Sequence, residues 1–180
     1  HAHPPAGLTL VVAAEQGVPA GTLEFGAVAV AIHFAAATAE ASPIRQAGVI
    51  AGGEFNVIGS NSTYGVIGGG VFGNIGSDAS HATIGGGSQN QISMNSAKST
   101  IGGGGANGIG GNSIASTISG GVANNVAADS SYATIAGGIG NFIRSSSSIS
   151  AIGGGMFNGI WNQNTNATIG GGYDNAIWQD

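Results

Sequence analysis

A strict 17-residue period runs through the last three quarters of the sequence. Isoleucine recurs at this spacing, without insertion or deletion, at Ile50, Ile67, Ile84, Ile101, Ile118, Ile135, Ile152 and Ile169. In every copy, the second and third residues after this isoleucine are glycines. An asparagine stands six residues after it in all copies except the second, where Gly73 occupies the position. A constant period of this kind indicates a repeat architecture in which each unit packs only on its neighbours.

A second apolar column lies eight residues after the first. Its members are Ile58, Ile75, Ile92, Ile109, Val126, Ile143, Ile160 and Ile177. The two columns divide each repeat into two short strands and two turns, with the isoleucines pointing inward and their neighbours outward. Helical repeats are longer and need leucine-rich amphipathic faces, which this sequence lacks. We therefore predict an all-β fold, a parallel β-solenoid (β-roll) of eight 17-residue coils over residues 47–180.

The glycine-rich stretches, such as IGGG at 84–87, raise the alternative of a phosphate-binding loop. The known fingerprints require GxGxxG between a strand and a helix, or GxxxxGK[ST]. Gly87 is followed by Ser88, Gln89, Asn90 and Gln91, with no lysine in reach and no helical pattern behind. Glycine permits the positive φ angles of tight turns at no steric cost, and stacked asparagines can hydrogen-bond from coil to coil. We interpret these glycines as turn residues.

The recurring pattern TIGGG..N.I, as in STIGGGGANGI and ATIGGGYDNAI, resembles the head repeats of YadA-like trimeric autotransporter adhesins. Similar repeats occur in phage and giant-virus fibre-like proteins. The resemblance covers residues 48–178. It implies a left-handed parallel β-roll, three chains packed around a common axis, and an adhesive role.

Residues 1–46 lack the repeat and form a predicted segment of their own. The alternating apolar pattern of TLEFGAVAVAIHF (22–34) predicts a strand, whereas the alanines of 35–42 leave a helix open. Pro43 marks the boundary before the repeats. We expect this β segment to cap the solenoid or to mediate assembly with a neighbouring subunit.

The charge and composition exclude several classes of partner. The net charge is −5 with three basic residues, which does not suit nucleic acid, because binding there depends on lysine and arginine at phosphates. No apolar run is long enough to span a bilayer, so we predict no membrane insertion. The chain has no cysteine, which excludes disulfides and thiolate metal sites. Charged residues make up only 6%, and this favours association between copies because little repulsion keeps their surfaces apart.

Nothing in the sequence favours catalysis. The acidic residues do not recur as a pair one coil apart, as a glycosidase would need, and the serines are interpreted as turn residues. We therefore expect no enzymatic activity and no cofactor. His1 and His3 could ligate Cu(II) or Ni(II) if His1 is the mature N-terminus; the alternative is a solvent-exposed end without a metal.

Two groups of outward-facing residues are candidate binding residues. The first is a threonine column that precedes the core isoleucine: Thr83, Thr100, Thr117, Thr134 and Thr168. Threonine pairs well across strands, and a flat threonine array also resembles small plant ice-binding β-rolls. The second group is aromatic and comprises Phe157, Trp161, Tyr173 and Trp178. Aligned aromatic faces can bind sugars or proteins, or can be buried at a subunit interface or under a cap.

These features together predict a non-enzymatic extracellular structural protein. The rigid solenoid would self-associate, as a trimer or a filament, into a fibre on a cell or virion surface, with cell-surface glycans or a host surface as partners. Two alternatives stay open: a receptor-binding segment of a viral or phage fibre, and an ice-binding β-solenoid.

Overall fold

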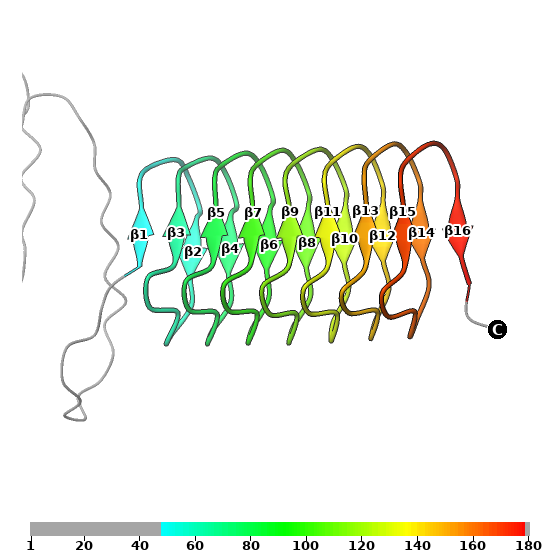
Figure 1. Cartoon of the computed structure of the whole chain (residues 1–180). Helices are drawn as coiled ribbons and strands as arrows, with labels where there is room; N and C mark the ends of the chain where they lie inside the picture. Colours follow the sequence, from blue (N-terminus) through cyan, green and yellow to red (C-terminus); the bar gives the residue numbers. More distant parts are fainter. Residues whose placement is uncertain (1–47, 179–180) are drawn as a thin grey trace, which may run out of the picture. The chain divides into compact units, whose positions relative to one another are not determined.

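The computed structural model describes residues 48–178, which form a solenoid of stacked coils (Figure 1). Each coil contributes two short parallel strands, and no helix occurs within this range. The predicted all-β solenoid is therefore confirmed. The N-terminal segment 1–46, with its predicted capping or assembly role, lies outside the described residues, as do His1 and His3.

The odd-numbered strands form one sheet and the even-numbered strands form another, each with 8 strands. The first sheet consists of β1 (Val49–Ile50), β3 (Val66–Ile67), β5 (Thr83–Ile84), β7 (Thr100–Ile101), β9 (Thr117–Ile118), β11 (Thr134–Ile135), β13 (Ala151–Ile152) and β15 (Thr168–Ile169). The second consists of β2 (Val57–Ile58), β4 (Asn74–Ile75), β6 (Gln91–Ile92), β8 (Gly108–Ile109), β10 (Asn125–Val126), β12 (Phe142–Ile143), β14 (Gly159–Ile160) and β16 (Ala176–Ile177).

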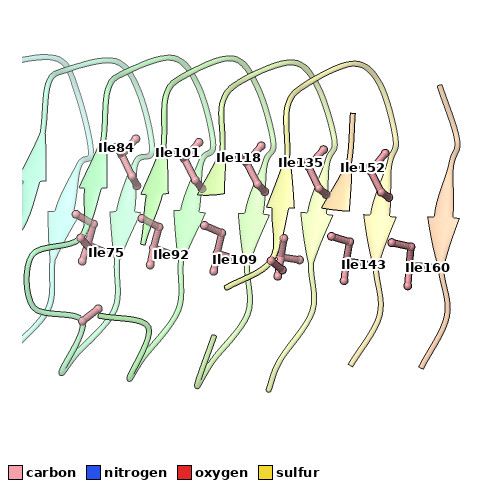
Figure 2. Packing of buried hydrophobic residues seen from close by; sticks show 14 of the residues in the cluster. Ile75, Ile84, Ile92, Ile101, Ile109, Ile118, Ile135, Ile143, Ile152 and Ile160 are labelled. Carbon is pink, nitrogen blue, oxygen red and sulfur yellow. The ribbon is translucent and has the colours of Figure 1, made fainter. Parts of the chain in front are cut away.

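The register of both sheets follows the sequence period. Ile101 of β7 lies beside Ile118 of β9, and Ile92 of β6 lies beside Ile109 of β8. Every strand thus pairs with the equivalent strand of the next coil. Figure 2 shows the two isoleucine columns pointing toward each other between the sheets, where they form the core.

The interior columns are closed to solvent except at the ends of the stack. From Ile67 to Ile160, both columns are at most 1% exposed, whereas the terminal members Ile50, Ile58 and Ile177 are only partly buried. A fully buried isoleucine contributes about 1.5–3 kcal/mol relative to an exposed one. An interior coil buries two such side chains, so its stability depends on having a coil on each side.

A buried asparagine ladder closes one corner of the coil. Asn107 donates its Nδ2 protons to the carbonyls of Gly103 (3.0 Å) and Gly121 (2.9 Å), one in its own coil and one in the next. Its Oδ1 accepts the backbone N–H of Asn124 at 3.0 Å. Each amide therefore satisfies two corner carbonyls and one amide of the following coil, which explains why asparagine follows the glycine pair at a fixed distance.

The second glycine of the pair is required by the close approach of the next coil. At Gly121, φ is +88°, and an added Cβ would lie 2.2 Å from the Gly138 carbonyl oxygen. No other residue fits there without moving the neighbouring backbone. The predicted turn role of the glycines is thereby confirmed.

Serines form two further buried ladders, so their interpretation as turn residues alone is wrong. Ser113 Oγ donates to the Ala127 carbonyl at 2.9 Å and accepts the Ser130 N–H at 3.1 Å. Ser116 Oγ donates to the Ser130 carbonyl at 2.9 Å and accepts the Ala133 N–H at 3.2 Å. A hydroxyl serves here because one oxygen both donates and accepts.

Besides the second glycine of the pair, each complete coil has three left-handed positions with φ near 60°, which non-glycine residues mostly occupy. In the fifth coil these are Ala123 (φ 56°), Asp129 (φ 60°) and Tyr132 (φ 59°). At each of them the backbone N–H points back toward the preceding coil; that of Tyr132, for example, donates to the Ile114 carbonyl at 2.8 Å. This inter-coil hydrogen bond offsets the roughly 1–2 kcal/mol that the left-handed conformation costs a residue with a Cβ atom.

Removal of one whole coil should leave a folded protein. Deletion of 99–115 joins Lys98 to Ser116 and keeps every inter-coil contact in register, whereas deletion of 99–107 places one strand column against the other. Solenoid stability is approximately a sum over neighbouring coils, so the first variant should melt cooperatively as a slightly less stable β protein. The second should lose β-type circular dichroism. Equal behaviour of the two variants would contradict the coil length.

Replacement of a ladder asparagine by aspartate should be strongly destabilising. In Asn124→Asp, the carbonyls of Gly120 and Gly138, each 3.0 Å from Nδ2, lose their donor and face a buried carboxylate. We expect a loss of about 3 kcal/mol or more in the free energy of unfolding at neutral pH.

The pH dependence of this variant has a definite sign. Burial raises the folded-state pKa of the new carboxyl group above about 3.9, its unfolded value, so the folded state binds the extra proton and unfolding becomes easier as pH rises through 4. Urea unfolding at several pH values measures this. Asn125→Asp, which places the same charge on the exposed neighbouring residue, is the control and should stay close to wild type.

Candidate functional site

The described residues contain no group of three or more histidine, cysteine or acidic side chains that could hold a metal ion. None of the secondary structure between residues 48 and 178 is a helix able to cross a membrane. Three sets of outward-facing side chains are candidate functional surfaces.

The threonine column lies on the outer face of the first sheet. The register places Thr83, Thr100, Thr117 and Thr134 side by side in four successive coils. Ala151 separates these from Thr168. The first three threonines are half-buried. The predicted threonines thus form a cross-strand ladder on this sheet, and the ladder is interrupted only at Ala151.

A second set of side chains forms an apolar edge along the solenoid. It consists of the fourth and fifth residues after each isoleucine of the first column, which runs from Ile50 to Ile169. The fourth residues pair from coil to coil in parallel bridges, such as Val71 with Ser88 and Met156 with Tyr173. The large exposed apolar members of this edge are Phe55, Phe72, Val122, Ile139, Phe157 and Tyr173.

The aromatic residues of the apolar edge meet at its two ends. Phe55 and Phe72 stack with ring centroids 5.0 Å apart, and Phe157 meets Tyr173 edge-on at 6.1 Å. The three phenylalanines have φ between 55° and 58°, so their rings extend outward from left-handed corners. Bulky side chains are uncommon in this conformation.

The third set is an aromatic–arginine cluster on the outer face of the second sheet, formed by Phe142, Arg144, Trp161 and Trp178. Trp161 and Trp178 stack with centroids 4.0 Å apart and an interplanar angle of 13°. Phe142 meets Trp161 at 85° and 5.5 Å. The Arg144 Cζ atom lies 4.8 Å from the centroids of both Phe142 and Trp161.

The four predicted aromatic residues therefore belong to two separate surfaces. Phe157 and Tyr173 lie on the apolar edge, Trp161 and Trp178 lie in the cluster, and no ring contact within the described residues joins the pairs. Phe142 and Arg144 were not among the binding residues predicted from the sequence. The repeat period could have indicated Arg144, because Arg144, Trp161 and Trp178 each directly follow an isoleucine of the second column and therefore occupy the same position in successive coils.

No protein-family model matches the sequence, and a search of the curated proteins finds no match either. The class of protein is thus defined by the architecture: a repeat protein folded as a parallel β-solenoid.

Proposed function

We propose that the chain is a non-enzymatic structural protein whose solenoids associate along the apolar edge into an extracellular, adhesive fibre. The observation that carries this proposal is the row of exposed aromatic and aliphatic side chains on that edge, with Phe55 69% and Phe72 52% exposed. Exposed apolar patches mark protein interaction sites in soluble proteins, and this edge has two, at Phe55 and Phe72 and from Val122 to Tyr173.

The backbone of the apolar edge supports this reading. Left-handed corners elsewhere in the coil are often occupied by asparagine or aspartate, such as Asn112 and Asp129, which tolerate the conformation. Phe72 and Phe157 instead combine an unfavourable conformation with exposure of a large ring to water. The inter-coil hydrogen bond accounts for the left-handed conformation of Phe72, but it does not require a large ring at this position. Burial of the exposed ring surface against another copy gives the ring a physical reason.

The interior supports a rod-like structural role. Backbone ladders, two isoleucine columns and buried asparagine and serine ladders connect the coils of the described region. All of these contacts repeat with the same register, so the solenoid can present a long surface without relying on any single coil. The resemblance to trimeric adhesin heads agrees with an assembly of several chains.

Substitution on the apolar edge should reduce self-association without unfolding the chain. We expect the double variant Phe72→Asn/Phe157→Asn to shift the full-length protein toward monomer, because asparagine suits the left-handed corner but removes both rings. Sedimentation velocity measures the assembly state, and thermal melting checks the fold.

Tyr132→Asn provides the matched control, because Tyr132 is also a left-handed residue, 63% exposed, but lies off the apolar edge. It should assemble as wild type does. A wild-type chain that stays monomeric at high concentration, or a double variant that assembles normally, would contradict the proposed interface.

The threonine column supports a second candidate function, ice binding, because four threonines align in consecutive coils. This candidate predicts thermal hysteresis from the purified chain. Thr117→Tyr should reduce the hysteresis by more than half by interrupting the flat column, whereas Asn125→Tyr on the other sheet should not. A wild-type chain without hysteresis would remove this candidate.

A further inference from the structure

We propose that the aromatic–arginine cluster binds an acidic saccharide, with a sugar carboxylate on the Arg144 guanidinium and C–H groups of the sugar rings against Trp178. This inference rests on the proposed adhesive function and names its ligand class. The site lies apart from the apolar edge, since its residues come from β12 and from the positions directly after β12, β14 and β16.

The fold does not require large side chains at this position. The other five coils have small residues directly after the second apolar column: Gly59, Gly76, Ser93, Gly110 and Ala127. These coils form the same strand pairs as the last three. Arg144, Trp161 and Trp178 are therefore additions to the outer surface, and coil geometry does not account for them.

The packing inside the cluster includes one unfavourable feature. Trp161 Nε1 is closed off from solvent and has no hydrogen-bond partner. A buried N–H group without an acceptor destabilises the folded state. The Phe142 ring lies over Gly159, where an added Cβ would come within 2.4 Å of it, so the cluster also depends on a neighbour without a side chain.

The arginine is held in a way that suits carboxylate recognition. Its guanidinium lies over two rings that are nearly perpendicular to each other, which restricts its orientation. No hydrogen bond within the described residues uses the guanidinium N–H groups, so they are available to a bidentate carboxylate. Arg144 is exposed, and it forms no ion pair within the described residues.

The surroundings favour a sugar as the carrier of that carboxylate. Trp178 is 62% exposed and offers an aromatic surface two coils from Arg144, about 10 Å along the rod, so a ligand of two or more sugar units can reach both. The exposed Ser145 and Asn162, next to Arg144 and Trp161 in the sequence, supply polar groups for hydroxyls.

The negative charge of the chain further limits the class of ligand. The net charge is −5, so the chain would repel a densely charged polyanion. A sugar with one carboxylate per unit is less highly charged, and its carboxylate can contact the Arg144 guanidinium at short range, where the attraction between the two charges is screened least.

The test is isothermal titration calorimetry of the full chain with trisaccharides of galacturonate, mannuronate and guluronate and with sialyllactose, each compared with its methyl ester. The ester keeps the sugar but removes the charge. We expect at least one acid to bind and its ester to bind at least tenfold more weakly. Absence of binding by all four acids, or equal binding of acid and ester, would overturn the proposal.

Three variants assign the binding to the cluster. Arg144→Gln should abolish the preference for the acid over the ester, and Trp178→Ala should weaken both at least fivefold. Phe55→Ala, which removes an exposed stacked ring from the apolar edge, should bind as wild type does. Unchanged binding by Arg144→Gln or Trp178→Ala would overturn the assignment.

Sedimentation velocity on the same variants separates this proposal from the proposed function. Arg144→Gln should assemble normally even when saccharide binding is lost, whereas failure of assembly in the wild-type chain would affect only the fibre proposal. Melting curves that match wild type show that each variant is folded. A loss of assembly in Arg144→Gln would instead identify the cluster as a subunit contact and overturn the saccharide proposal.

Discussion

The structure depends above all on hydrogen bonds that join each coil to the next at one fixed register. The asparagine ladder illustrates the constraint: Asn141 Nδ2 reaches Gly137 in its own coil at 2.9 Å and Gly155 in the next at 3.0 Å. One residue inserted between them would leave buried carbonyls without donors, which costs more than most loop insertions. This requirement explains why the repeats tolerate no change in length although many of their outer residues differ.

Because the interior satisfies its own packing and hydrogen bonding, the exterior is free to vary from coil to coil. The apolar edge is aromatic at its two ends, whereas its third and fourth coils have small or polar residues such as Gln89 and Ala106. The aromatic–arginine cluster is confined to the last three coils. The proposed assembly surface and the proposed saccharide site are therefore local variations on a uniform scaffold, and each can be changed without affecting the other.

The fold was largely predictable, and the left-handed corners were not. A repeated sequence imposes the same environment on every copy, so the isoleucine period predicted the sheets, the register and the core together. Tyr132 and Phe72, however, have no intrinsic preference for positive φ. Their conformation is stabilised by backbone donation to the preceding coil, as from Phe72 N–H to the Glu54 carbonyl at 3.0 Å. Such a bond exists only once the coils have stacked.

The sequence by itself determined the coil length, the two buried columns and the absence of thiol chemistry, because these follow from spacing and composition. Only the tertiary structure decided which outward side chains meet. Phe157 pairs with Tyr173, whereas Trp161 pairs with Trp178 and receives Phe142 and Arg144. The physical reason is that the period assigns each residue to a column of equivalent positions. Contact between residues of different columns depends on the backbone direction at each corner and on the orientation of each aromatic ring. Those directions are set by the neighbouring coils.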